Sequence, residues 1–337
     1  MASLRAYVLA RLVLMLPMIL ILVTLVFIVL RILPGDPVLA VLGPKATFQE
    51  RERLREQLGL NKPLPFQYVD YLSGILTGNL GRSMIFGRRP VIDEILDRFP
   101  ATLELAIVSS IFAAAIGLAA GSSGALSKKT SVDVGSRLYG IISYSFFIPW
   151  LGLMFQMVLS VWLGLFPVSG RIEPLMAPTR ITGLYLIDGL LTGNLTSFAS
   201  AAWHLALPSL TLGLVISGIY AKLGRTSFSE VLAQDYVLAA VARGIKKGTI
   251  FRNHVIRNAL VPLLTIMGLQ FALLLGGTVL TETTFSWPGM GYLIFERILY
   301  RDYYTIQGIL VFFAFLVVVV NLLVDVVYAY VDPRIRF

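Results

Sequence analysis

Several stretches of this sequence are long enough and apolar enough to cross a membrane, and no other feature limits the fold as strongly. A helix needs about 20 consecutive apolar residues to span the hydrocarbon core. Backbone groups in lipid must be hydrogen-bonded within the protein, which favours helices. We expect six spans, at residues 12–30, 105–125, 138–166, 205–221, 259–281 and 304–323. The sequence therefore predicts an all-α integral membrane protein.

Composition excludes several classes of function. The 337 residues are 57% hydrophobic and only 14% charged, too few charges to cover a soluble protein of this length. The net charge of +9 is best explained by membrane orientation, so we expect no nucleic-acid partner. The absence of cysteine excludes disulfides and thiolate metal sites, and two histidines cannot form a histidine-rich metal site. We therefore expect no metal site and no catalytic residue.

The polar and apolar segments divide the chain into four parts. Residues 1–33 carry the first span, which we read as retained because its apolar run is too long for a signal peptide. Residues 34–98 are polar and predict an α-rich insertion, with helices ending near Gly59 and Gly78. Residues 99–331 hold the other five spans, and residues 332–337 form a tail.

Two of the spans carry further signals. Ala113, Gly117 and Gly121 lie four residues apart on one face of the second span, where small side chains allow a neighbouring helix to approach closely. The third span is long, so we expect it to tilt and to kink at Pro149.

The distribution of basic residues predicts the orientation. With the N-terminus in the cytoplasm, the short segments on that side hold a clear excess of Lys and Arg, whereas the short segments opposite are near neutral. Six spans with both termini cytoplasmic satisfy this rule. The stretch from Asp235 to Pro262 then lies on the side where ATP is found.

That stretch predicts a short apolar helix in water, between two spans. Asp235 suits the N-cap, and Gly244 suits the C′ position, where the left-handed conformation closes a helix. The residues between them are mostly apolar, and basic residues follow. An exposed apolar surface of this kind usually marks a partner site, although packing on its own neighbours is the alternative.

The same residues resemble a known family. Ala239-Ala240-x-x-x-Gly244, His254 and Asn258-Ala259-Leu260-x-Pro262 are similar to the Glu-Ala-Ala loop of the permeases of ABC importers, closest to those for dipeptides and oligopeptides. Leu238 stands where Glu is usual and Arg257 where Pro is frequent, so no salt bridge from the Glu position is expected. Further matching motifs are Leu33-Pro34-Gly35-Asp36-Pro37, Ala101-Thr102-Leu103-Glu104-Leu105, Pro167-Val168-Ser169-Gly170-Arg171, Thr281-Glu282-Thr283 and Asn321-Leu322-Leu323-Val324-Asp325.

The resemblance implies a fold, a location and a set of partners. It implies the type-1 importer permease fold in the bacterial cytoplasmic (inner) membrane, with the insertion outside the cytoplasm. The partners would be a homologous second permease, two ATPase subunits and an extracytoplasmic solute-binding protein. Transport would proceed by alternating access. In the family, the loop at about residues 223–258 couples to an ATPase subunit; the matching positions are Asp235, Ala239, Ala240, Arg243, Gly244 and His254.

The resemblance also implies a division of labour. The dipeptide Gly-Lys never occurs, so the chain lacks a phosphate-binding loop of the Gly-x-x-x-x-Gly-Lys-Ser/Thr type. We expect no cofactor on this chain, with ATP and Mg²⁺ bound by the ATPase subunits. Di- or oligopeptides are the implied substrates, and related permeases carry nickel, glutathione or oligosaccharides.

Ionisable and amide side chains near the spans are candidates for the substrate pathway. Glu104 and Glu282 lie near the outer ends of the second and fifth spans, where either carboxylate could meet a substrate ammonium group or pair with an arginine. Gln270, in the fifth span, could line a polar path or hold helices together. Asp325 is expected to pair with Arg334 or Arg336.

Two other classes of function must be weighed. Gly121-Ser122-Ser123-Gly124 matches a motif of intramembrane serine proteases, which need a histidine beside the serine. His204 is expected at the outer end of the fourth span, whereas Ser123 is expected near the inner end of the second. His254 is expected in the coupling loop, so we disfavour a protease. An ATP-independent channel is the third hypothesis, distinguished by whether ATPase subunits bind.

Overall fold

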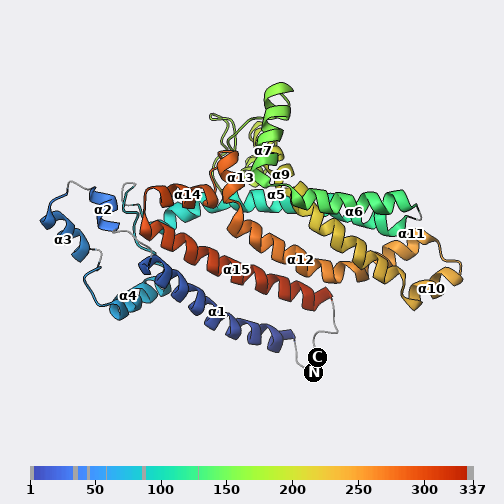
Figure 1. The fold of residues 1–337 in the computed structure, drawn as a ribbon, viewed down its shortest axis with the longest axis horizontal. Coiled ribbons are helices and arrows are strands. Elements are labelled where there is room, and N and C mark those ends of the chain that lie inside the picture. Colours follow the sequence, from blue (N-terminus) through green and yellow to red (C-terminus); the bar gives the residue numbers. More distant parts are fainter. Residues whose placement is uncertain are drawn as a thin grey trace.

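A computed structural model describes residues 4–32, 37–43, 46–57, 59–85, 89–127 and 129–331, and these residues are mainly helical. In this part of the chain, five helical segments are long and apolar enough to cross a membrane. The main helices of these segments are α1 (Leu4–Ile32), α5 (Val91–Leu126), α9 (Leu195–Leu232), α12 (Ile256–Gly277) and α15 (Tyr303–Val331). The long helices run in roughly the same direction along the molecule (Figure 1).

The third predicted span consists of two helical segments at a large angle, so the prediction of one helix kinked at Pro149 was wrong. Helix α6 (Thr130–Ser145) is followed by α7 (Ile148–Phe155), and the π-helix η1 (Gln156–Trp162) continues α7. The chain bends by 97° between α6 and this second helical segment. Helix α7 stands away from the bundle (Figure 1). Pro149 lies in the first turn of α7, where a missing N–H costs no helical hydrogen bond, so it starts a new helix and does not bend an old one. If the bent pair counts as one span, there are six.

The polar insertion is α-rich, as predicted. It consists of α2 (Pro37–Leu42), α3 (Phe48–Gln57) and α4 (Leu64–Leu76). Gly59 and Gly78 follow α3 and α4 with φ of 64° and 73°, values that suit glycine, so both predicted helix ends are confirmed. The motif Leu33–Pro37 lies largely outside the described residues.

The remaining helices are short and connect the long ones. They are α8 (Tyr185–Leu191), α10 (Asp235–Ala242), α11 (Lys247–Ile250), the π-helix η2 (Phe251–Val255), α13 (Val279–Thr284) and α14 (Met290–Leu299). Helix α13 packs against α7, α14 lies next to α13, and α10 lies at the far end of the bundle (Figure 1).

Helices α5 and α9 form the central pair, and they meet along the predicted face of small residues. A Cβ atom added to Gly117 would lie 2.6 Å from the carbonyl oxygen of Ser217 and from Cβ of Tyr220. One added to Gly121 would lie 2.8 Å from the carbonyl oxygen of Ala221. Buried apolar side chains from α5, α9 and α12 complete this core. The backbones of the pair therefore approach as closely as small residues permit.

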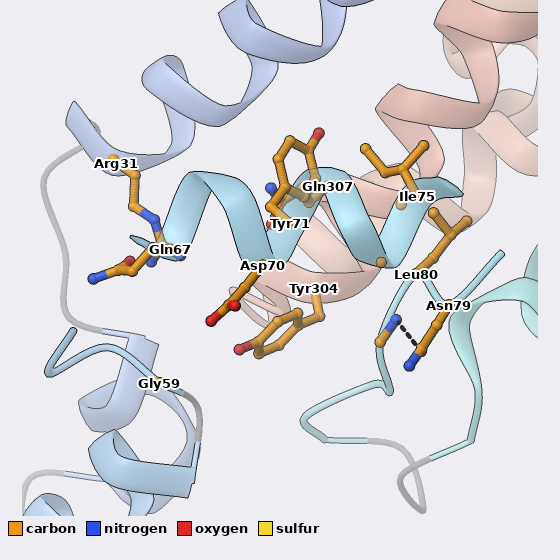
Figure 2. A pocket seen from close by; sticks show the side chains of 13 residues that line it. Arg31, Gly59, Gln67, Asp70, Tyr71, Ile75, Asn79, Leu80, Tyr304 and Gln307 are labelled. Atoms are coloured by element: carbon orange, nitrogen blue, oxygen red, sulfur yellow. Dashed lines mark hydrogen bonds between the residues drawn. The ribbon is translucent and has the colours of Figure 1, made fainter. Parts of the chain in front are cut away.

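Helix α15 lies between α1 and α12 (Figure 1). Asp325 forms an ion pair with Arg11 of α1, with 3.3 Å between Nε and Oδ2. The predicted partners Arg334 and Arg336 lie outside the described residues, so that pairing stays a prediction. At the other end of α1, Thr24 shares a 2.6 Å hydrogen bond with Tyr68 of α4. A cavity of about 210 Å³ lies beside this junction, between α1, α4 and α15 (Figure 2).

We predict that Gly117→Ala destabilises the protein by about 1–3 kcal/mol, because its methyl group overpacks the contact with α9. Gly135→Ala is the matched control, since Gly135 lies in α6 and a Cβ there meets nothing within 4 Å. Thermal unfolding of the two variants in detergent provides the measurement. Equal melting temperatures for both variants would contradict the close-packed interface.

Candidate functional site

Helix α10 forms where the sequence predicts it, but it begins differently. The N-cap is Gln234, whose side chain makes no capping hydrogen bond, and Asp235 is the first helical residue. The prediction of Asp235 as N-cap was therefore wrong by one position. Its carboxylate still lies in the first turn, where negative charge is favourable near the positive end of the helix dipole.

The end of α10 is closed as predicted. Gly244 has φ of 75°, its N–H donates to the carbonyl of Val241 (3.0 Å), and the N–H of Ile245 donates to that of Ala240 (3.3 Å). These two bonds form a Schellman motif, which satisfies carbonyls that the helix would leave free. A Cβ on Gly244 would meet nothing within 4 Å, so the backbone conformation alone selects glycine here.

One face of α10 is packed and the other is open. Val237 is 2% exposed and packs in a cluster with Phe228, Ile250, Val255 and Ala259. On the open face, Leu238 is 56% exposed, Val241 51% and Ile245 39%, and Ala239 is also exposed. Both alternatives considered from the sequence are thus realised: the helix is anchored to its neighbours, and it presents an apolar stripe outward.

The surroundings of α10 are polar and basic. The hydroxyl of Tyr236 accepts a 3.0 Å hydrogen bond from the amide of Asn258, which ties the start of α10 to the start of α12. His254 is exposed in η2, with its ring centroid 6.5 Å from that of Tyr236. Arg243 is exposed beside the apolar stripe. Further exposed cations in this region are Lys246, Arg252 and Arg257.

Glu104 forms a buried ion pair with an arginine that the sequence did not identify. Its Oε2 accepts from Nε (3.1 Å) and Nη2 (2.8 Å) of Arg171, and the side chains are 4% and 6% exposed. Its Oε1 accepts from the N–H of Leu186 at 2.8 Å. The guanidinium of Arg171 also lies 3.8 Å from the ring centroid of Tyr185. Glu104 therefore has the arginine partner that was the alternative to a substrate contact.

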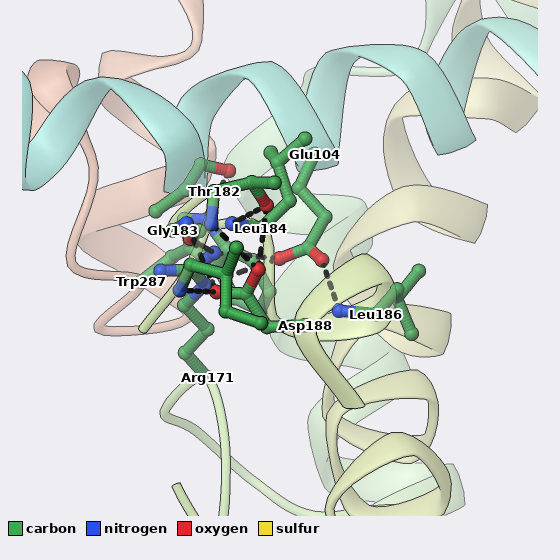
Figure 3. A network of polar contacts seen from close by, with 10 residues as sticks. Glu104, Arg171, Thr182, Gly183, Leu184, Leu186, Asp188 and Trp287 are labelled. Carbon is green, nitrogen blue, oxygen red and sulfur yellow. Dashed lines mark hydrogen bonds and ion pairs between the residues drawn. The ribbon is translucent and has the colours of Figure 1, made fainter. Parts of the chain in front are cut away.

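Asp188 organises the loop that carries this ion pair. Its carboxylate accepts from the N–H groups of Ile181 (3.2 Å), Thr182 (2.8 Å) and Gly183 (2.9 Å) (Figure 3). Burial alone would raise the pKa of Asp188, but these bonds and the one from the Thr182 hydroxyl lower it below its usual value. The segment between η1 and α9 is thereby fixed on the N-terminal half of α5.

Glu282 is also fully enclosed. Its Oε1 accepts from the hydroxyls of Thr102 and Thr278, each at 2.7 Å, and its Oε2 accepts from the N–H of Tyr292 at 2.9 Å. The residue is 0% exposed. A Cβ on Gly289 would lie 2.4 Å from this carboxylate. Glu282 therefore caps the first turn of α14, and no face of it is open to a passing substrate in this conformation.

The amide side chains divide between structure and surface. Gln156 donates to the carbonyl oxygens of Val168 (2.8 Å) and Thr284 (3.1 Å), and so joins η1 to α13. Gln270 is half-buried on α12. Of the three predicted pathway residues, only Gln270 is not buried, because Glu104 and Glu282 are 4% and 0% exposed.

Comparisons with known proteins agree with these features. Residues 4–106 match the family model "Binding-prot-dependent transport system membrane comp, N-term", and residues 113–337 match "Binding-protein-dependent transport system inner membrane component". This chain is a binding-protein-dependent transport permease. It belongs to the ABC importer permeases, and it crosses the membrane several times.

The relatives share most of the permease's length. A dipeptide transport system permease protein of Alkalihalophilus pseudofirmus is 39% identical, with 98% of this chain and 99% of that protein covered. A di/tripeptide transport system permease protein of Pseudomonas aeruginosa is 42% identical, with 93% of each covered. A glutathione transport system permease protein of Escherichia coli K12 is 38% identical, with 98% and 99% covered.

A solved structure supports the type-1 fold. The MetNI methionine ABC transporter, in an inward-facing conformation, matches with a TM-score of 0.52 and 16% identity, over 72% of this chain and 97% of that one. At that identity, the match concerns the arrangement of helices only.

The geometry disfavours the serine protease hypothesis. The hydroxyl of Ser123 donates to the carbonyl of Ala120 in its own helix at 2.8 Å. Nδ1 of His204 lies 2.8 Å from the carbonyl oxygen of Ser200, and His254 lies beside Tyr236. Neither histidine of the permease is a base for Ser123 in this structure.

We predict that Glu104→Gln lowers folding stability by about 3–5 kcal/mol, because it leaves the buried Arg171 without a counter-charge. Glu173→Gln, which changes an exposed carboxylate of the same segment between η1 and α9, is the control and should have almost no effect. Thermal unfolding of the purified permease measures both. A Glu104→Gln variant of unchanged stability that fails only in transport would restore the substrate-contact hypothesis.

Proposed function

We propose that this permease is the transmembrane subunit of an ATP-driven importer of di- or oligopeptides, and that α10 is the element on which an ATPase subunit docks. The observation that carries the proposal is the open face of α10, where Leu238, Val241 and Ile245 are exposed at the end of the bundle. An exposed apolar stripe beyond the spans needs a protein partner to cover it.

The supports of α10 suit this role. A docking helix must move as one body with the spans that it drives. Val237 anchors α10 in an apolar cluster, the Schellman motif closes it, and Asn258 ties it to α12. In the proposed interface, Asp235, Ala239, Ala240, Arg243, Gly244 and His254 contact or shape the surface that meets the ATPase.

The proposed cycle follows alternating access. ATP and Mg²⁺ bind in two ATPase subunits, their closure draws the docking helices together, and the pathway opens outward to a solute-binding protein. Hydrolysis reverses the movement. A second, homologous permease completes the pathway. The chain itself contains no Gly-Lys dipeptide and hence no phosphate-binding loop of the usual type.

We place both termini and α10 in the cytoplasm, and the insertion outside it. The excess of Lys and Arg in the short segments near α10 supports this orientation. The proposed parts are residues 1–33 with the first span, 34–98 as the extracytoplasmic insertion, 99–331 as the type-1 transmembrane domain, and 332–337 as the cytoplasmic tail.

For the substrate pathway, we retain Gln270 only. It is half-buried on α12, and its amide can both donate and accept hydrogen bonds. We assign structural roles to Glu104 and Glu282, because their carboxylates are surrounded by hydrogen-bond donors of the protein itself. Peptides are supported as the substrate class by the names of the dipeptide relatives. Glutathione is the second candidate, because a permease named for it is 38% identical.

We predict that Val241→Asp reduces binding of the ATPase subunits by about tenfold or more, because docking would bury an unpaired carboxylate. Val132→Asp, an exposed apolar position of α6, is the control. Co-purification with the ATPase subunits and uptake of a labelled dipeptide in proteoliposomes measure the effect. Unchanged co-purification of Val241→Asp would contradict docking at α10, and uptake without any ATPase would favour a channel.

A second prediction concerns the end of α10. Gly244→Ala should destabilise the left-handed C′ conformation by about 1–2 kcal/mol and slow ATP-driven uptake, while the protein still inserts into the membrane. Gly248→Ala is the control, because Gly248 has open space and no positive φ. Uptake rates at equal amounts of membrane-inserted protein decide the question. Equal rates for the two variants would show that the closure of α10 is not needed for coupling.

A further inference from the structure

The cavity between α1, α4 and α15 lies outside the proposed transport machinery. It has a volume of about 210 Å³, and its lining includes Arg31, Gln67, Asp70, Tyr304 and Gln307. Helix α4, which contributes to its lining, lies at the end of the molecule opposite α10 (Figure 1), and Figure 2 shows the lining side chains. None of its residues belongs to the α10 surface or to the buried pairs of Glu104 and Glu282.

The cavity lies at the level of a membrane surface. The apolar span of α1 ends at Arg31, and that of α15 begins at Tyr303. Below Arg31, α1 presents an apolar face in which Ile21 is 66% exposed, Leu25 55% and Ile28 47%. These residues are spaced by four and three positions, so they form one exposed side of the helix. A ligand here would have a polar end in the cavity and room for an apolar tail along α1.

Among the described residues, Arg31 has no carboxylate within ion-pair distance. Its guanidinium lies 5.3 Å from the ring centroid of Phe27. Its side chain points from the end of α1 toward Gln67 of α4 (Figure 2). Guanidinium groups bind phosphates well, because their N–H groups match two phosphate oxygens at once.

The neighbouring groups of the cavity are acceptors. Oε1 of Gln67 is buried and has no hydrogen-bond partner among the described residues, whereas its amide nitrogen donates to the carbonyls of Leu60 (3.2 Å) and Lys62 (2.7 Å). Asp70 carries a negative charge at the rim, with Lys62 Nζ 2.5 Å from its Oδ2. A buried acceptor without a donor is costly, so an N–H group from a ligand would be stabilising here.

We propose that this cavity binds the headgroup of an aminophospholipid such as phosphatidylethanolamine. Its phosphodiester lies at Arg31, and its ammonium donates to Oε1 of Gln67 and faces Asp70. The acyl chains follow the apolar side of α1. A free dipeptide has the same two charges, but it would leave the apolar face of α1 uncovered. The proposal depends on the placement of α1 in a membrane and not on the transported substrate.

The main test uses the full-length permease, purified in mild detergent from membranes that contain phosphatidylethanolamine. Native mass spectrometry counts the lipids retained during stepwise delipidation. We expect one tightly held phosphatidylethanolamine in the natural protein and about tenfold weaker retention in Arg31→Gln, from the loss of a charge-assisted hydrogen bond. Arg301→Gln removes an exposed arginine near the start of α15, outside the cavity, and should retain the lipid. Equal retention in all three proteins would overturn the proposal.

A second measurement needs no variant and therefore does not depend on Arg31→Gln folding. Phosphatidylethanolamine and phosphatidylcholine share the phosphodiester, but the choline group has no N–H to donate. Adding the first lipid to delipidated protein should raise its melting temperature more than adding the second. Equal shifts would contradict the role of Gln67 and Asp70. Displacement of the retained lipid by millimolar dialanine would assign the cavity to peptides and overturn the lipid assignment.

Discussion

The close contact of α5 and α9 through small residues is the constraint on which the rest of the structure depends. In a membrane, a leucine gains little by leaving lipid for protein, so helices associate through backbone approach and polar contacts. Gly117 and Gly121 allow that approach, and Ser136, Ser143 and Ser217 add hydrogen bonds that fasten α6 to the same pair. The central three helices thus form a base for the shorter elements.

Against these three helices, two buried ion pairs and one buried carboxylate that caps a helix fix the segment opposite α10. Glu104 holds Arg171, and Glu282 closes the first turn of α14. A third pair, Glu94 with Arg297, is also buried, with 2.9 Å between Oε2 and Nη2. Desolvated charges add little net stability, but removing one member of a pair is severe, so they specify one arrangement of α5, α14 and the loop between η1 and α9.

The sequence predicts what is local and misses what joins distant segments. Apolar runs gave the approximate positions of five spans, and Gly244 gave the end of α10, because both signals act within a few residues of the chain. The right angle between α6 and α7 was missed, since Phe146 and Phe147 at the break are as apolar as the helices beside them. The partner of Glu104 is 67 residues away, beyond any periodicity in the sequence.

Helix α9 joins the two polar ends of this permease in a single element. Asn194 caps its start by accepting from the N–H of Ser197 at 3.1 Å, six residues after Asp188. Its end is followed within three residues by the start of α10. The helix has 38 residues, a length of about 57 Å at 1.5 Å per residue. The helix is continuous through Pro208, and beside it the hydroxyls of Ser209 and Thr211 donate to the carbonyls of Leu205 and Leu207. In the proposed mechanism, a displacement of the docking helix would therefore act on the segment opposite through one rod packed against α5. The alternative, a relay through many loops, would lose most of that displacement in flexible connections.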